Sequence, residues 1–171
     1  MKNKLTLIIS NFLFMLCISL LYTNKTFAQE HGIYELVKNE VSQKKSNTNK
    51  DRSDFYNLSK KLHATHYFEQ NKLKHRYGES APVKISLESM NSFSLLNQNN
   101  SNYKGVKLIT ITLKNESELD TPIDLSNIEG FPKLQYIYIK CLFKCTANQI
   151  ERFVKAPNDR IRIFYISVRP S

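Results

Sequence analysis

The chain has 171 residues, 41% of them hydrophobic, and carries 25 Lys and Arg against 15 Asp and Glu, a formal net charge of +10. This length suits one domain of ordinary size behind a leader. Only four glycines occur, and the sequence shows no phosphate-cradling glycine loop, no nucleophile–base elbow and no acidic metal cluster. We therefore expect a protein that is not an enzyme and that needs no cofactor or metal.

Residues 1–28 read as a signal peptide. A basic start is followed by an apolar stretch over residues 5–22, and Thr26 and Ala28 supply the small residues that a signal peptidase requires. We expect cleavage after Ala28 and export, either secretion or delivery to the periplasm. The alternative is an uncleaved membrane anchor through residues 5–22, which are about as long as a minimal span.

Removal of this leader takes away three of the 25 basic residues and no acidic one, which leaves 143 residues with a net charge of +7. A basic exported domain meets anionic envelope components or acidic protein surfaces more readily than nucleic acid. The alternative is that the excess charge serves solubility alone.

The region 29–80 has helical spacing and is expected to form a helical N-terminal cap. Residues 32–45 place apolar side chains on one helical face, and a longer helix is expected to begin at Asp54 and to stop at Gly78. His63 and His66 would then share a helical face, but zinc needs a third protein ligand. We interpret both as solvated histidines.

The region 81–171 contains a repeat of strand-like segments. They begin at Pro82, Leu108, Leu134 and Ile161, at steps of 26, 26 and 27 residues, and in the last three segments apolar residues occupy positions one, four and six. The intervening stretches look helical, and Thr146 with Gln149 forms a capping box, as does Ser126 with Glu129.

The step and the L-x-x-L-x-L segments resemble the leucine-rich repeat family over about residues 82–168. The resemblance implies an α/β fold in which the helical N-terminal region is followed by a short parallel β-solenoid of about four strands. A mixed α/β sheet with coincidental spacing is the structural alternative.

In that register one sheet face would be free to bind. The expected concave face comprises Thr110, Thr112, Lys114, Tyr136, Tyr138, Lys140 and Tyr165. Tyrosine is a common interface anchor, because it joins a large apolar area to a hydrogen-bonding tip. The alternative is that a helix or loop of the same chain covers the tyrosines.

Cys141 and Cys145 are the cysteines outside the leader. An oxidising compartment favours a disulfide between them, which we expect to be structural. The alternative is two buried free thiols that pack as small hydrophobic side chains.

The sequence thus predicts an exported, non-enzymatic binding module that presents a small sheet face to a protein or an anionic envelope partner. An exported hydrolase or other envelope enzyme of unrelated α/β fold is the alternative. The last strand, residues 161–168, would leave an open edge for self-association or for a partner's strand, unless the N-terminal helices or a loop shield it.

Overall fold

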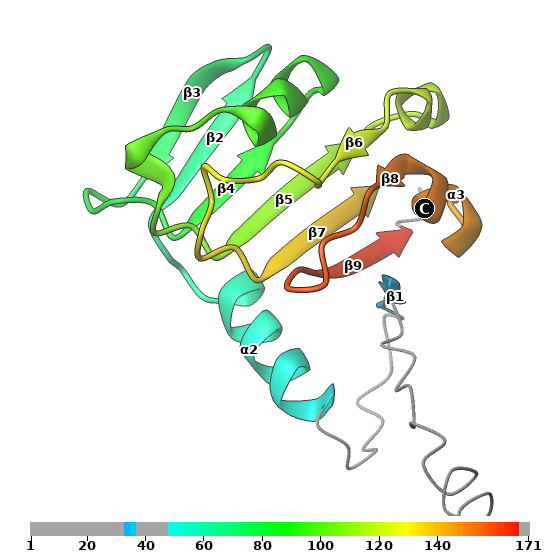
Figure 1. Ribbon diagram of the computed structural model, residues 1–171, viewed down its shortest axis with the longest axis horizontal. Helices are drawn as coiled ribbons and strands as arrows, with labels where there is room; N and C mark the ends of the chain where they lie inside the picture. The colour runs from blue at the N-terminus through cyan, green and yellow to red at the C-terminus, as the bar shows by residue number, and fades with distance from the viewer. Residues whose placement is uncertain (1–32, 37–47, 168–171) are drawn as a thin grey trace, which may run out of the picture. The chain divides into compact units, whose positions relative to one another are not determined.

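The computed structural model describes residues 33–36 and 48–167, all of which belong to one compact unit (Figure 1). The expected signal peptide, residues 1–28, lies outside the described residues, as does the apolar stretch 5–22. None of the described helices combines the length and the hydrophobicity that a membrane crossing demands.

The fold is built on a seven-stranded sheet. In spatial order its strands are β1 (Ile33–Glu35), β9 (Arg162–Ser167), β7 (Tyr136–Cys141), β5 (Leu108–Leu113), β4 (Lys84–Leu87), β2 (Thr65–Glu69) and β3 (Lys72–Tyr77). Every neighbouring pair is parallel except β2 and β3, which are antiparallel. Figure 1 shows β4, β5, β7 and β9 lying side by side in chain order.

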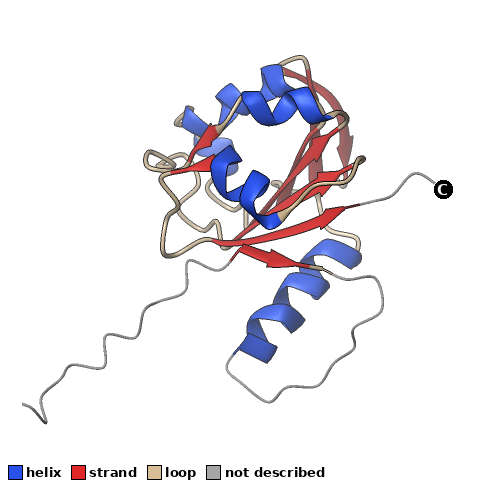
Figure 2. Cartoon of the chain, turned by 90° about the vertical axis from the view of Figure 1, so that its right-hand side faces the viewer, coloured by secondary structure: helices blue, strands red, loops and turns tan. Residues whose placement is uncertain are grey.

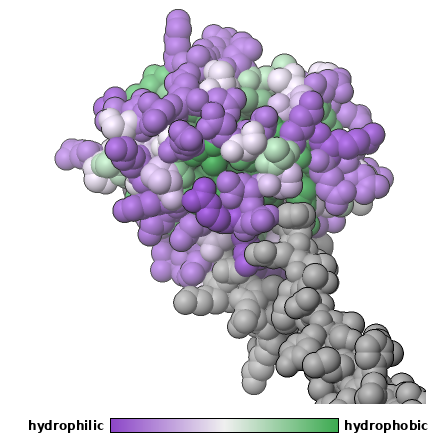
Figure 3. Space-filling view, viewed as in Figure 1, coloured by the Kyte–Doolittle hydropathy of each residue, from purple (hydrophilic) through white to green (hydrophobic). Residues whose placement is uncertain are grey.

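The remaining elements lie on both faces of this sheet (Figure 2). One face carries η1 (Met90–Asn97), η2 (Ser101–Tyr103), η3 (Glu116–Asp120), α3 (Ala147–Phe153) and a two-stranded sheet of β6 (Ile123–Asp124) and β8 (Val154–Lys155). The helix α2 (Thr48–Lys60) packs on the opposite face. Hydrophilic residues cover most of the side that Figure 3 shows.

The expected fold, a helical N-terminal region followed by a four-stranded solenoid, is wrong. Residues 65–77, expected to be helical, form the β2–β3 hairpin, and Gly78, the expected helix stop, follows a strand with φ +79°. The turn residues Gln70 and Asn71 have φ of 50° and 59°, the left-handed conformation that tight hairpin turns require. The sheet therefore joins strands from both expected regions, 29–80 and 81–171.

The expected register between the strands is also wrong. Ile85 pairs with Ile109, Ile109 with Ile137, and Ile137 with Ile163, so the steps are 24, 28 and 26 residues. Since side chains alternate between the faces of a strand, the apolar residue at position one of each segment points away from those at positions four and six. The regular step is a coincidence of segment starts.

The main core lies between the sheet and the face that carries α3. Leu113, Ile137 and Ile139, expected to be core residues, are each 0% exposed, which confirms that expectation. The capping box of Thr146 and Gln149 is also confirmed, at the start of α3. The box expected at Ser126 opens no helix, and the amide of Ser126 instead binds the carboxylate of Asp124 at 2.8 Å.

The expected open edge at the end of the chain is wrong. Strand β9 lies between β7 and β1, and Ile33, Tyr34 and Glu35 pair with Ile163, Phe164 and Tyr165. The shielding element is therefore a strand, where helices or a loop were the alternative. Val168 lies outside the described residues.

Candidate functional site

One half of the sheet face opposite α3 is covered by α2. Phe55, 1% exposed, stacks on Phe164 with ring centroids 4.2 Å apart and meets the edges of Tyr136 and Tyr138 at 5.8 and 5.3 Å. Leu108 and Leu36 complete this small apolar cluster. The helix thus hides the part of the face nearest β9 and the start of β5.

The other half of the same face carries polar side chains, and we call it the open face. Its residues come from alternate positions of β4, β5 and β7: Lys84, Ser86, Thr110, Thr112, Tyr138 and Lys140. The sheet register aligns Ser86, Thr110 and Tyr138 in one row across the three strands, with Thr112 beside Lys140. Two ammonium groups, three hydroxyls and one phenol therefore share a small area.

The two lysines repel each other. Burial of the Lys84 side chain lowers its pKa, and the positive charge of Lys140 lowers it further. The ammonium of Lys84 donates to the carbonyl oxygen of Lys61 at 3.1 Å, and that of Lys140 lies 5.4 Å from the ring centroid of Tyr138. Within residues 33–36 and 48–167, neither ammonium forms a salt bridge with a carboxylate.

Carboxylates occur at one end of the open face, where they already have partners. Glu88 accepts a hydrogen bond from Ser86, while Glu69 accepts one from Lys74 and lies 3.6 Å from the ammonium of Lys114. The hydrogen bond and charge of Lys74 lower the pKa of Glu69. These acids leave the Lys84 and Lys140 charges without compensation.

The structure brings together most of the expected binding residues. Thr110, Thr112, Tyr138 and Lys140 are on the open face, and Lys114 follows β5 at its end. Tyr136 is on the same side but lies beneath α2, 4% exposed.

The expected position of Tyr165 is wrong. This side chain points to the main core, 2% exposed, and its hydroxyl donates to the carboxylate of Glu35 at 3.1 Å. Burial and this hydrogen bond raise its pKa to about 12. Phe164, expected in the core, takes the place on the opposite face and packs under Phe55.

Sequence reasoning missed the contribution of β2. Tyr67 pairs with Ser86 and so continues the open-face row, with its ring 5.5 Å from that of His75 on β3. The alternation of Thr65, Tyr67 and Glu69 was the available signal, but the segment was interpreted as a helix.

Cys141 and Cys145 are free, buried thiols in the structure, which therefore lacks the expected bridge. Burial raises the pKa of both groups. The amide of Cys145 also donates to the hydroxyl of Ser167 at 3.2 Å, which ties the segment after β7 to β9.

The two histidines do not share a helical face, because His66 is in β2 and His63 lies in the loop before it. His63 contacts the carbonyl oxygen of Asn57 at 3.3 Å, and His66 packs edge-on to Tyr103. Burial and the charge of Arg76 lower the pKa of His66. Across the described part of the chain, no three His, Cys, Asp or Glu residues are grouped to hold a metal ion.

A scan against protein-family models finds no match to this chain, and searches of curated proteins and of solved structures also find none. The resemblance to leucine-rich repeats stays a prediction from the sequence. The functional argument therefore rests on the geometry of the open face.

Proposed function

We propose that this protein is an exported, non-enzymatic binding module whose open face receives an anionic group of a protein or envelope partner. One observation carries the proposal: Lys84 and Lys140 place two mutually repelling ammonium groups on a half-buried sheet surface, with no carboxylate of the described chain to neutralise them. The non-enzymatic part rests on the sequence, which offers no catalytic motif.

The surroundings of the two lysines suit such a partner. The Thr110 hydroxyl and the Tyr138 phenol lie between them in the register and supply further hydrogen-bond donors. An anion bound between the two ammonium groups would remove their repulsion, and the half-buried setting would strengthen each charged contact relative to an exposed one. Tyr138 adds apolar area beside the charges.

The experiment compares two charge-matched double variants. We expect Lys84→Gln with Lys140→Gln to weaken binding to phosphatidylglycerol vesicles or to a polyglutamate peptide by about fivefold to thirtyfold, since each lost ion pair contributes about 0.5–1 kcal/mol. The control, Lys72→Gln with Lys144→Gln, removes two exposed lysines at other positions and should bind as the unmodified protein does.

The two probes separate the partner classes, because vesicles represent an envelope surface and the peptide represents an acidic protein segment. Equal loss of binding in both double variants would mean that net charge alone drives association. That result would contradict a site on the open face.

A further inference from the structure

A second surface feature lies away from the open face, at the amino-terminal ends of β5, β7 and β9. It is a pocket of about 280 Å³ formed by the turn before β7 and the residues that open β5 and β9. Its lining consists of Lys107, Ile128, Phe131, Pro132, Lys133, Leu134, Gln135, Arg160 and Ile161. None of these residues belongs to the open face.

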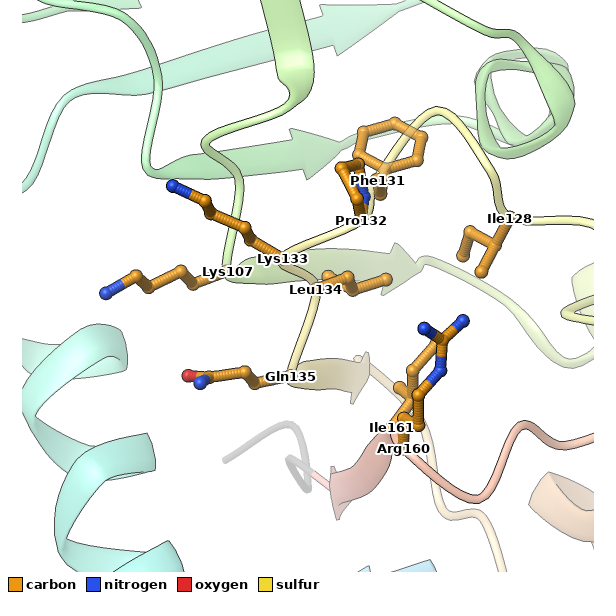
Figure 4. A pocket seen from close by; sticks show the side chains of 9 residues that line it. All are labelled: Lys107, Ile128, Phe131, Pro132, Lys133, Leu134, Gln135, Arg160 and Ile161. Carbon is orange, nitrogen blue, oxygen red and sulfur yellow. The ribbon is translucent and has the colours of Figure 1, made fainter.

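The pocket combines an apolar floor with positive charge on two sides. Figure 4 shows Leu134 in the middle, the side chains of Lys107 and Lys133 extended together to one side, and the Arg160 guanidinium on the other. Three of the nine lining residues are basic and none is acidic. In the described part of the chain, no carboxylate forms a salt bridge with any of the three.

The backbone around the pocket already has hydrogen-bond partners. The amides of Gln135 and Tyr136 both donate to the carbonyl oxygen of Lys107, at 3.0 and 3.1 Å, and the amide of Leu134 donates to Phe131 at 3.0 Å. The polar groups offered to a ligand are therefore mainly side chains: the three cations and the Gln135 amide.

The wall of the pocket is held in place from behind. Phe131 is 2% exposed and stacks on Tyr103 with their planes 5° apart. Gly130 packs so closely on the backbone of Gln98 that an added Cβ would lie 2.1 Å from its carbonyl oxygen. A fixed wall lowers the ordering cost that binding would otherwise carry.

We infer that this pocket binds a short acidic peptide segment of a partner protein, in which an apolar side chain lies between two carboxylates. The apolar side chain would contact Leu134 and Ile161, one carboxylate would meet the Lys107 and Lys133 ammonium groups, and the other would meet Arg160. Arg160 is oriented by the 3.4 Å hydrogen bond from its Nε to Asn158, which leaves its terminal nitrogens for a carboxylate. The volume admits a few side chains, so a short segment fits.

The test is a titration of the full protein with labelled peptides, followed by fluorescence anisotropy. An Asp-Leu-Glu peptide should bind at least about tenfold more tightly than Asn-Leu-Gln or Asp-Ser-Glu, because each change removes either both ion pairs or the apolar contact. Lys107→Gln with Lys133→Gln should weaken binding, and so should Arg160→Gln. The matched controls, Lys72→Gln with Lys144→Gln and Arg152→Gln, should not.

Several outcomes would overturn the inference. Equal affinity for the three peptides would show that the pocket does not select this pattern, and binding of free adipate as tightly as the peptide would assign the pocket to a small dicarboxylate. Equal effects of the pocket and control variants would show that net charge dominates. The Lys84 and Lys140 variants should leave peptide binding at the pocket unchanged, so the failure of one site is distinguishable from the failure of the other.

Discussion

Phe55 is the side chain through which α2 is fixed to the sheet, so Phe55→Ala is the most direct perturbation of this contact. The ring is 1% exposed and contacts Phe164, Tyr136 and Tyr138 at centroid distances of 4.2–5.8 Å. Truncation of a buried phenylalanine costs about 3–5 kcal/mol. Much of that cost should appear as loss of α2 docking, because the cluster around Phe55 is separate from the main core.

The assay combines chemical denaturation with hydrogen exchange. Phe55→Ala should lower the free energy of unfolding and should speed exchange of the α2 amides more than that of the β5 and β7 amides. Leu62→Ala is the control, because Leu62 is 79% exposed just beyond α2 and its truncation should change stability by no more than about 0.5 kcal/mol. If Phe55→Ala matches this control in both measurements, α2 does not depend on that contact and the reasoning is refuted.

Three further predictions concern the core and the segments that β9 joins. Ile137→Ala should cost about 2–5 kcal/mol in a denaturant titration, because Ile137 is 0% exposed, and an unchanged midpoint would contradict its place in the core. The pKa of Tyr165 is raised from 10.0 to about 12, so its contribution to stability is complete below pH 10 and is lost as the pH rises towards 12; Tyr165→Phe should reduce this alkaline loss, and an identical pH profile would count against the Glu35 hydrogen bond. Cys141 and Cys145 should react slowly with a thiol reagent in the native protein and should count as two thiols after denaturation without reductant, whereas a count of zero before reduction would establish the bridge.

The positions of the strands could be predicted from the sequence, but their register could not. The segments that begin at Leu108, Leu134 and Ile161 overlap β5, β7 and β9 closely, because runs of β-branched and aromatic residues are typical of strands. In β9 apolar side chains occupy both faces, so Phe164 and Tyr165 are equally suited to the core by composition. A one-residue shift exchanges the faces, and only the pairing with β7 and β1 decides between them.

The N-terminal half was misjudged for a related reason. In residues 54–77 apolar side chains occur at spacings that fit a helix, and the short turn at Gln70 and Asn71 contains neither glycine nor proline to mark it. Contacts distant in the sequence settle the structure there, since Thr65 and Phe68 on β2 pair with Lys84 and Leu87 on β4. The same dependence on distant contacts explains why Tyr67 was missed as a member of the open face.

The central claim is that the Lys84 and Lys140 ammonium groups form an anion site. It is tested most directly by NMR titration of the Lys84 side chain, in the free protein and with a saturating anionic probe that binds it. The account predicts a Lys84 pKa below the ordinary lysine value in the free protein, a rise in that pKa when Lys140→Gln removes the neighbouring charge, and a rise when the probe binds. An ordinary Lys84 pKa that neither Lys140→Gln nor the probe changes would contradict it.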